Sequence, residues 1–234
     1  FFNDGSGATL TQRALAPLAP QLASARQLHG TRVLEHGAAP EGWQRAEGAD
    51  GHWSVAQGVA CAVTVADCVP VFLAHPSGAV ALLHAGWRGT AGRILEAGIE
   101  QLGRRGLAAS ELRLHLGPAI CGRCYEVGPE VFGQLTGWTT VRRRHVDLRA
   151  LLAEQAKELG VKQITASPYC TRCDNDRFFS HRCGDSGRQV AVIVTRGRSS
   201  NPVEQQAGRA TRSSNRPVEQ QAGRATGRSS NLDS

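Results

Sequence analysis

Short apolar blocks separated by glycine- and proline-rich polar segments run through the first two thirds of the chain. Residues 59–65 and 79–83 are rich in Ala and Val and are bounded by glycine or proline, which favours buried strands over helices. Residues 76–78, Pro-Ser-Gly, supply a turn between them. The block 58–90 therefore predicts strand, turn, strand and a glycine-rich turn that leads into a helix.

The same pattern predicts further elements on both sides of this block. We expect strands at residues 31–34, 111–120, 161–166 and 188–195, with Leu112, Leu114 and Leu116 on one face. We expect helices at residues 91–104, capped by Thr90, at 125–135 and at 145–159, the last ended by Gly160. Residues 10–25 predict a short helix and a loop, and the glycines of residues 35–52 predict a loop.

These elements predict a single α/β domain over residues 1–195, with a mixed β-sheet and flanking helices. No G-x-G-x-x-G segment follows a strand, which argues against a doubly wound nucleotide-binding fold.

The composition changes abruptly at residue 196. The segment RSSN-PVEQQAGRAT at residues 198–211 recurs at residues 212–226, and a third copy begins at Arg228. The repeat has few apolar residues and no period that could build a core. We therefore predict that residues 196–234 form a disordered C-terminal tail, which a cloning remnant would also explain.

The formal net charge is +7, but it is unevenly distributed. The tail holds seven arginines and three acidic residues, so four of the seven net charges belong to it. The remaining charge argues for no particular partner, though it would not repel an anionic substrate, and we do not expect nucleic acid as a partner. The sequence has no apolar run of about 18 residues, the length that would span a membrane.

The cysteine content bears on the compartment. The chain has seven cysteines, an odd number scattered along its length, which fits reduced thiols and metal binding better than a secreted disulfide framework. No basic segment followed by a long apolar one marks the N-terminus. The sequence therefore predicts a cytoplasmic protein.

Metal-binding residue types lie at the ends of the two central apolar runs. Asp67 and Cys68 follow the first run, and His84 follows the second. If the two runs form adjacent strands, these residues lie close together at the ends of strands in one sheet. A thiolate beside an imidazole suits Zn²⁺ or a copper ion. The alternative is a buried cysteine and a hydrogen-bonded structural histidine. His29, at the turn before the strand at residues 31–34, is by pattern a surface-turn histidine.

Two C-x-x-C pairs, Cys121/Cys124 and Cys170/Cys173, are a second candidate metal site. The long separation between the pairs leaves two interpretations open. They form a structural Cys₄ zinc site if the fold brings them together, or they are four thiols in loops.

The turn at residues 86–89, Gly-Trp-Arg-Gly, precedes the predicted helix at residues 91–104. Free backbone N–H groups, the helix dipole and Arg88 would together favour an anion there. The alternative is a tight turn that merely needs glycine.

Five motifs occur in a distinctive order, and their sequences are QLHG (27–30), ADCVPVFL (66–73), HAGWRGT (84–90), LGPAICGRCYEVGPEVF (116–132) and CTRCDNDRFFSHR (170–182). Together they resemble the bacterial laccase-domain family, also called the multicopper polyphenol oxidoreductase type. Its members are described as purine nucleoside phosphorylases with adenosine deaminase side activity. The family's T-x-R-x-G-G opening is not found here, and its paired arginine becomes Arg182-Cys183.

The resemblance implies a metal site made of His29, Cys68 and His84, with Zn²⁺ or Cu²⁺ as the cofactor. Two histidines and one cysteine leave a position open, as in catalytic zinc sites. Within this scheme we expect Gly86, Arg88 and Arg182 to bind phosphate or substrate, and Asp67 to orient a ligand or move a proton.

The activity that the resemblance implies is phosphorolysis of adenosine or inosine, with a nucleoside and phosphate as small-molecule partners. The alternatives are copper-dependent oxidation of phenols with O₂ and a metal-stapled binding module without turnover. Against laccase chemistry, the eight histidines include no H-x-H pair.

Overall fold

The computed structural model describes residues 19, 21–38 and 41–195. All of these lie in the first of two compact units, Phe1–Arg198. The predicted tail at residues 196–234 lies outside the described residues, and so does most of the predicted helix at residues 10–25.

The larger of two main sheets has six strands in the order β11-β8-β6-β7-β4-β2. It is mixed, because β7 pairs antiparallel with β6 and β4, whereas β8 pairs parallel with β11 and β4 pairs parallel with β2. Its strands are β2 (Val33–Glu35), β4 (Gly51–Ser54), β6 (Val69–Ala74), β7 (Val80–Ala85), β8 (Arg113–Leu116) and β11 (Gln163–Ala166).

The second main sheet has four strands in the order β12-β5-β1-β3. These are β1 (Gln21–Ala25), β3 (Gly42–Ala46), β5 (Val59–Val65) and β12 (Gln189–Val194). A short ribbon joins β9 (Glu126–Val127) to β10 (Arg144–His145).

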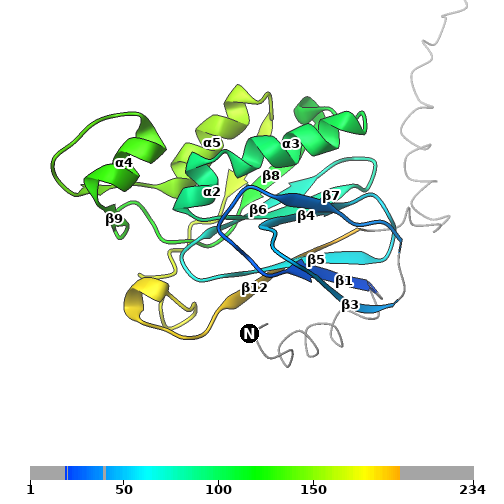
Figure 1. Cartoon of the computed structure of the whole chain (residues 1–234), viewed down its shortest axis with the longest axis horizontal. Helices are drawn as coiled ribbons and strands as arrows, with labels where there is room; N and C mark the ends of the chain where they lie inside the picture. Colours follow the sequence, from blue (N-terminus) through cyan, green and yellow to red (C-terminus); the bar gives the residue numbers. More distant parts are fainter. Residues whose placement is uncertain (1–18, 20, 39–40, 196–234) are drawn as a thin grey trace, which may run out of the picture. The chain divides into compact units, whose positions relative to one another are not determined.

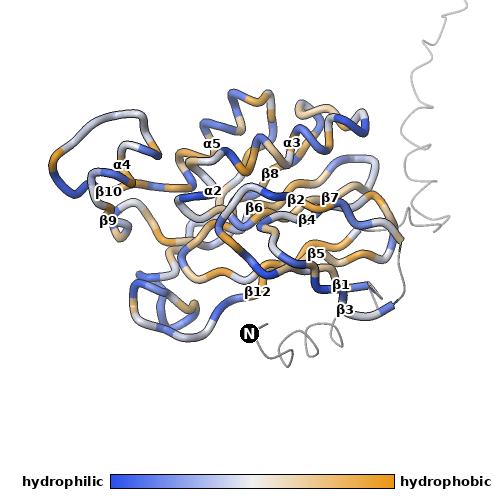
Figure 2. The backbone as a smooth tube through the Cα atoms, in the orientation of Figure 1, coloured by the Kyte–Doolittle hydropathy of each residue, from blue (hydrophilic) through white to orange (hydrophobic). Residues whose placement is uncertain are grey.

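Three of the helices, α2, α3 and α5, cover one face of the six-stranded sheet, and the four-stranded sheet packs against the other face (Figure 1). The helical elements are α2 (Trp87–Ala91), α3 (Ile94–Arg104), η1 (Ala109–Glu111), α4 (Pro129–Thr136), α5 (Leu148–Glu158) and η2 (His181–Cys183). One core cluster joins α3 and α5 to the six-stranded sheet, and a second one joins the two sheets through Val63, Leu82 and Ala191. The central strands are accordingly the most hydrophobic part of the tube in Figure 2.

The predicted fold class is confirmed: the described chain is a mixed α/β domain. The strands divide between separate sheets, whereas the sequence predicted one sheet. Leu112, Leu114 and Leu116 are all buried, as the alternation predicted. Gly160 has a positive φ of 87° after α5, the conformation for which glycine is favoured at helix ends.

Three local predictions are wrong. Residues 35–52 are not simply a loop, since β3 and the start of β4 lie there, and residues 21–25 are strand β1. Thr90 does not cap a helix; it is buried within α2, and the predicted helix is broken at Arg93, whose φ is 63°. Pairing with distant strands and burial override weak local signals in these segments.

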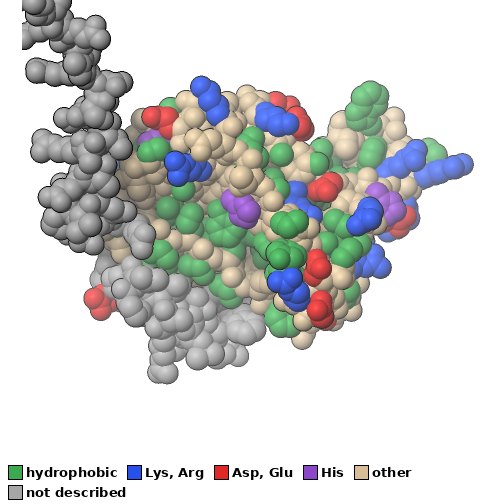
Figure 3. Space-filling model, turned by 180° about the vertical axis from the view of Figure 1, so that it is seen from behind, with side chains coloured by type: hydrophobic (Ala, Val, Ile, Leu, Met, Phe, Trp, Pro, Cys, Tyr) green, Lys and Arg blue, Asp and Glu red, His purple; other side chains and the backbone are tan. Residues whose placement is uncertain are grey.

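The described surface adds two observations. None of the helices that the structure describes has the length and apolar character that crossing a membrane requires. Basic and acidic side chains are interspersed on the face seen in Figure 3, so the positive charge of the described domain is not gathered into one stripe there.

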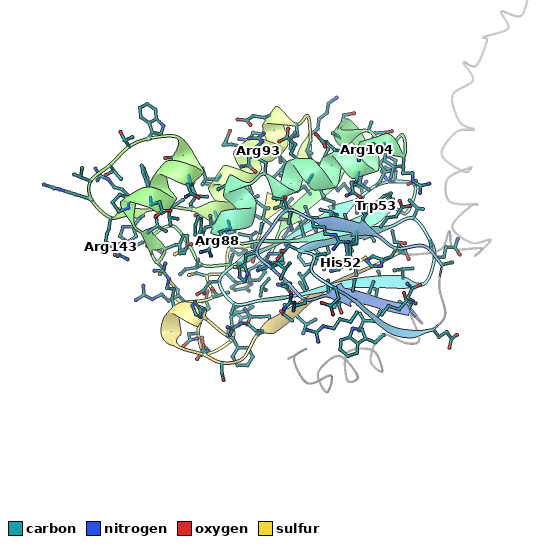
Figure 4. The ribbon with its side chains drawn as sticks, viewed as in Figure 1. His52, Trp53, Arg88, Arg93, Arg104 and Arg143 are labelled. Atoms are coloured by element: carbon teal, nitrogen blue, oxygen red, sulfur yellow. The ribbon has the colours of Figure 1, made fainter. Side chains whose placement is uncertain are left out.

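Two histidines, one buried and one half-buried, contact each other beside β2 and β4. His52 in β4 (Figure 4) is fully buried, and its Nδ1 lies 2.9 Å from Nε2 of His36. Its Nε2 has no hydrogen-bond partner within the described chain. Burial, followed by the charge of His36, lowers the pKa of His52 to about 3.

We expect the free energy of unfolding to fall as the pH falls from about 6.5, the pKa of histidine in an unfolded chain, toward about 3. In this window the unfolded chain binds more protons than the folded one, because the folded protein keeps His52 neutral. Denaturant unfolding between pH 7 and pH 4, with a chelator present to remove metal effects, should show a shallower slope for His52→Gln. Replacing the exposed His145 by Gln should keep the wild-type slope, and equal slopes for all three proteins would contradict the prediction.

Candidate metal centre

Three side chains from distant parts of the sequence meet at one end of the two sheets. His29 lies in the turn after β1, Cys68 lies between β5 and β6, and His84 lies in β7. One possible ligand atom from each lies within 4.8 Å of the others. The rings of His29 and His84 meet edge to face, with centroids 4.8 Å apart.

Cys68 owes its position to a crossover between the sheets. β5 ends at Val65 in the four-stranded sheet and β6 begins at Val69 in the six-stranded sheet, so only three residues connect them. Asp67 in this link has a φ of 83°, a left-handed conformation that is uncommon outside glycine. The pairing of Val69 with Ala85 then places Cys68 beside the end of β7.

Gln27 fixes the turn that carries His29. Its side-chain N–H donates to the carbonyl of Thr64 over 2.9 Å, and its Oε1 accepts from the N–H of Thr64 over 2.7 Å. His29 itself has a φ of 59°. The turn is therefore held against β5, two residues before the crossover begins at Ala66.

Asp50 connects the His29 turn to His84. Its buried carboxylate accepts hydrogen bonds from the backbone N–H groups of Leu28, His29 and Gly30, over 2.8–3.0 Å. It also lies 2.8 Å from Nδ1 of His84. Burial raises the pKa of Asp50, but the hydrogen bonds from His84 and Gly30 outweigh this, so its pKa is lowered overall.

The contact with Asp50 leaves Nε2 of His84 free to face Cys68. A carboxylate on the far nitrogen of a metal-binding histidine fixes the ring and raises its basicity. Burial lowers the pKa of His84, but Asp50 and Cys68 together raise it to about 9.

Cys68 is stabilised as a thiolate. Burial raises its pKa, whereas hydrogen bonds from His29 and His84 lower it to about 6. A thiolate is the form of cysteine that binds metals. Two imidazoles, one thiolate and a carboxylate behind one imidazole therefore fit a Zn²⁺ or copper ion.

Gly86 is required for close approach at this centre. A Cβ atom there would lie 3.0 Å from Sγ of Cys68 and 3.4 Å from a ring carbon of His29. α2 begins directly after Gly86 but has only five residues, so its dipole contributes less than the predicted longer helix would. Arg88 projects from α2 (Figure 4), with its guanidinium 4.3 Å from the centroid of the Trp87 ring.

Two cavities meet at His29 and Cys68, and the larger of them also reaches His84. The larger one has a volume of about 470 Å³, and its lining includes Arg26, Arg45, Arg188 and three histidines. The smaller one, of about 280 Å³, is lined by Trp87, Tyr125, Arg88 and Arg182 among others. His29, Cys68 and His181 line both cavities.

Asp67 lines the smaller cavity, but its carboxylate is already occupied. Oδ1 accepts from the hydroxyls of Thr171 and Ser180, over 2.6 and 2.8 Å, and Oδ2 accepts from the backbone N–H of Arg182 over 2.8 Å. The Arg182 guanidinium lies 4.8 Å from the Tyr125 ring centroid and donates to the carbonyl of Glu126. Asp67 thus ties the crossover to the loop at residues 170–182.

The structure places every predicted site residue around the two cavities, and it adds some that sequence reasoning missed. Asp50 reads as an ordinary loop residue, and nothing in its neighbourhood predicts its contact with His84. His181 lies within the FFSHR motif, which was the available signal for it. Thr171 and Ser180 carry no signal that separates them from other loop hydroxyls.

The site and fold together define a class, namely an α/β protein in which two histidines and one cysteine come together beside cavities. Residues 7–196 match the family model described as "Multi-copper polyphenol oxidoreductase laccase". The chain belongs to this family, and the resemblance carried by its motifs is confirmed.

Three relatives illustrate the family. A protein of Deinococcus radiodurans named "Purine nucleoside phosphorylase" is 36% identical over 191 residues, which cover 77% of this chain and 72% of that protein. A protein named "Adenosine deaminase RL5", from an unknown prokaryotic organism, is 38% identical over 63% of this chain and 62% of its own length. The crystal structure of YlmD from Geobacillus stearothermophilus superimposes with a TM-score of 0.71 at 30% identity, covering 80% of this chain and 79% of that one.

We expect Asp50→Asn to weaken metal binding by about 10- to 100-fold, the range found when such supporting carboxylates are replaced. Each oxygen of Asp50 accepts two hydrogen bonds, so an amide nitrogen at either position leaves two donors without an acceptor. Competition with a chromophoric chelator on the folded protein measures the loss. Glu111→Gln, at an exposed carboxylate paired with His75, is the control, and wild-type affinity in Asp50→Asn would refute the role of Asp50.

Proposed function

We propose that this chain is a metal-dependent purine nucleoside phosphorylase, with residues 1–195 as the enzyme domain. The observation that carries the proposal is the group His29, Cys68 and His84, of which His29 and Cys68 line two adjoining cavities that both contain arginine and His84 lines the larger one. The names of the relatives from Deinococcus radiodurans and other bacteria support the substrate class.

His29, Cys68 and His84 are the proposed ligands, with Zn²⁺ as the metal. When bound, Zn²⁺ supplies a Lewis acid with a coordination position left open beyond its three protein ligands. Asp50 holds the His84 ring in the orientation that leaves Nε2 for the metal. The thiolate state of Cys68, favoured by both histidines, supplies the negative ligand.

Phosphate is proposed to bind in the smaller cavity. Arg88 and Arg182 line it, and each guanidinium lies over an aromatic ring that limits its motion. Guanidinium groups bind phosphate oxygens through charge-assisted hydrogen bonds. Gly86 belongs to the same wall and keeps it open beside Cys68.

The nucleoside is proposed to occupy the larger cavity. Its volume of about 470 Å³ falls in the range usual for small-molecule sites, and the wall that it shares with the smaller cavity includes His29 and Cys68. A sugar at this wall would lie between the base on one side and phosphate on the other.

In the reaction, a phosphate oxygen attacks C1′ of the ribose and the bond from C1′ to the purine nitrogen breaks. The bonding pair leaves with the purine, which takes up a proton, and the products are ribose 1-phosphate and the free base. Arg88 and Arg182 orient the attacking phosphate and balance its charge. His181, which lines both cavities, is the proposed proton donor to the base.

Asp67 is better explained as a positioning residue than as a proton carrier. Three donors already surround its carboxylate, two from side chains and one from the backbone of Arg182. We propose that it sets the position of the Arg182 backbone, and through it the phosphate side of the site.

Adenosine deamination is the second candidate, favoured by the relative named "Adenosine deaminase RL5". In that reaction a water attacks the purine carbon that bears the amino group, and the amino group leaves as ammonia. A Zn²⁺ held by His29, Cys68 and His84 would supply the Lewis acid that activates the water. Oxidation of phenols by a copper-loaded form is the third candidate. Among the described residues, the only group of possible ligands that contains histidine is the three-residue one, too few imidazoles for a multicopper cluster.

The deciding experiment is chromatographic analysis of inosine or adenosine incubated with the zinc-loaded protein, with and without phosphate. We expect free base and ribose 1-phosphate to appear only with phosphate, and to fall at least about 100-fold in Cys68→Ala, since the ligand set loses its only thiolate. The matched control is Cys61→Ala, which removes a buried thiol from β5 that takes no part in the cluster.

Other products identify the other candidates. Inosine formed from adenosine without phosphate identifies the deaminase. Oxygen uptake with a phenolic dye and Cu²⁺, without release of base, identifies the oxidase. Either result in the absence of phosphorolysis would overturn the proposed function.

Arg88→Gln should raise the KM for phosphate by about 10- to 100-fold while changing the KM for the nucleoside far less. Hydrogen bonds to a charged group contribute about 1.5–3 kcal/mol, and about 1.4 kcal/mol corresponds to tenfold. Arg104→Gln, at an exposed arginine of α3 (Figure 4), is the control. An equal rise in both KM values would place Arg88 outside the phosphate site.

A further inference from the structure

Four cysteines form a second cluster, separate from His29, Cys68 and His84. They are Cys121 and Cys124, in the turn after β8, and Cys170 and Cys173, in the loop after β11. Although 45 residues separate the two pairs, the four sulfur atoms all lie within 4.8 Å of one another. The parallel pairing of β8 with β11, continued by a bridge between Ala119 and Cys170, brings the loops together.

We propose that these four cysteines bind one structural Zn²⁺ ion. A Zn–S distance of about 2.3 Å in a tetrahedral site places the sulfur atoms about 3.8 Å apart. Sγ of Cys124 lies 3.4 Å from Sγ of Cys173. A disulfide would require about 2.05 Å, so the observed spacing is closer to that of a shared ion.

The backbone around Cys170 is arranged for a thiolate. Its sulfur accepts the N–H of Cys121 over 3.3 Å and the N–H of Cys173 over 3.4 Å. Donors aimed at a sulfur stabilise negative charge on it. The N–H of Cys124 in turn donates to the carbonyl of Cys121, which closes the first pair into a compact turn.

Each pair also carries an arginine between its cysteines. Arg123 lies in the first pair and Arg172 in the second, and the Arg172 guanidinium donates to the carbonyl of Cys124 across the cluster. Four thiolates around one Zn²⁺ leave a charge of −2, which the Arg172 guanidinium beside the cluster partly offsets. Because protein ligands fill all four positions, the site is of the closed, structural kind.

Residues within and next to the two cysteine pairs contact Asp67, so the four-cysteine cluster supports the position of the crossover. Thr171, fully buried, donates its hydroxyl to Asp67, the neighbour of Cys68. The N–H of Ile120, next to Cys121, donates to the carbonyl of Asp67. An ion that fixes both cysteine turns would therefore fix two of the contacts that position the crossover.

The test is metal analysis of the reduced protein after Zn²⁺ loading and gel filtration. We expect two zinc ions per wild-type chain and one in Cys68→Ala, because that variant keeps the four-cysteine cluster. Cys173→Ser, at an exposed ligand, should also hold one, and the double variant should hold none. Cys183→Ser, at an exposed cysteine outside both clusters, should hold two.

Cobalt substitution tests the ligand set without altering the cluster. Cys68→Ala loaded with Co²⁺ should show the visible bands of a tetrahedral site and strong near-ultraviolet thiolate-to-metal absorption. A Cys68→Ala protein that binds neither Zn²⁺ nor Co²⁺ would overturn the proposal. A Cys124–Cys173 disulfide that persists in reducing buffer, or iron in place of zinc, would also overturn it.

Discussion

The Asp50 carboxylate is the contact on which the candidate metal centre depends. It accepts three backbone N–H groups from the His29 turn and contacts the ring of His84, so one buried side chain fixes two of the three proposed ligands. A buried carboxylate is costly unless donors surround it, and here four do. Its backbone carbonyl also accepts the N–H of His84, which ties the same residue to β7 from a second direction.

Asp67 plays a corresponding part on the other side of Cys68. Asp50 hydrogen-bonds to the His29 turn and to β7, whereas Asp67 hydrogen-bonds to the loop at residues 170–182 and so holds it against the crossover. Cys68 therefore lies between two carboxylates, neither of which is its partner. Each carboxylate holds neighbouring chain segments in place through its hydrogen bonds. The groups that hydrogen-bond to Cys68 are the two histidines. These hydrogen bonds hold two connecting turns in uncommon backbone conformations, since Asp67 and His29 both have a positive φ. The turns in these conformations bring the three proposed ligands together.

The fold class and most of the strands could be predicted from the sequence, because buried apolar runs such as Val59–Val65 are recognised without knowledge of their partners. The family could be predicted from its motifs. Sequence reasoning missed β1, β3 and β4, whose residues carry no clear period and become strands by pairing with strands such as β5 and β7. In the candidate site, His29 could be singled out only by its motif. Asp50 could not be found at all, because its importance lies in contacts with residues 20 to 34 positions away. For the C-x-x-C pairs the sequence left two alternatives open, since their approach depends on the register of β8 and β11.

The two clusters suit different tasks because their ligands differ in charge. Four thiolates more than neutralise a divalent cation, which leaves little power to polarise a bound substrate and no free position. Two neutral imidazoles and one thiolate leave a net charge of +1 and an open position. The histidine-containing set also faces both cavities, whereas the four cysteines lie where two loops must be joined. We propose that the first cluster takes part in the reaction and that the second one stabilises the fold. This division follows from the charge of the ligands as well as from their position. Thr171 and Asp67 form the physical link between them, because one hydrogen bond joins the loop of the cysteines to the link that carries Cys68.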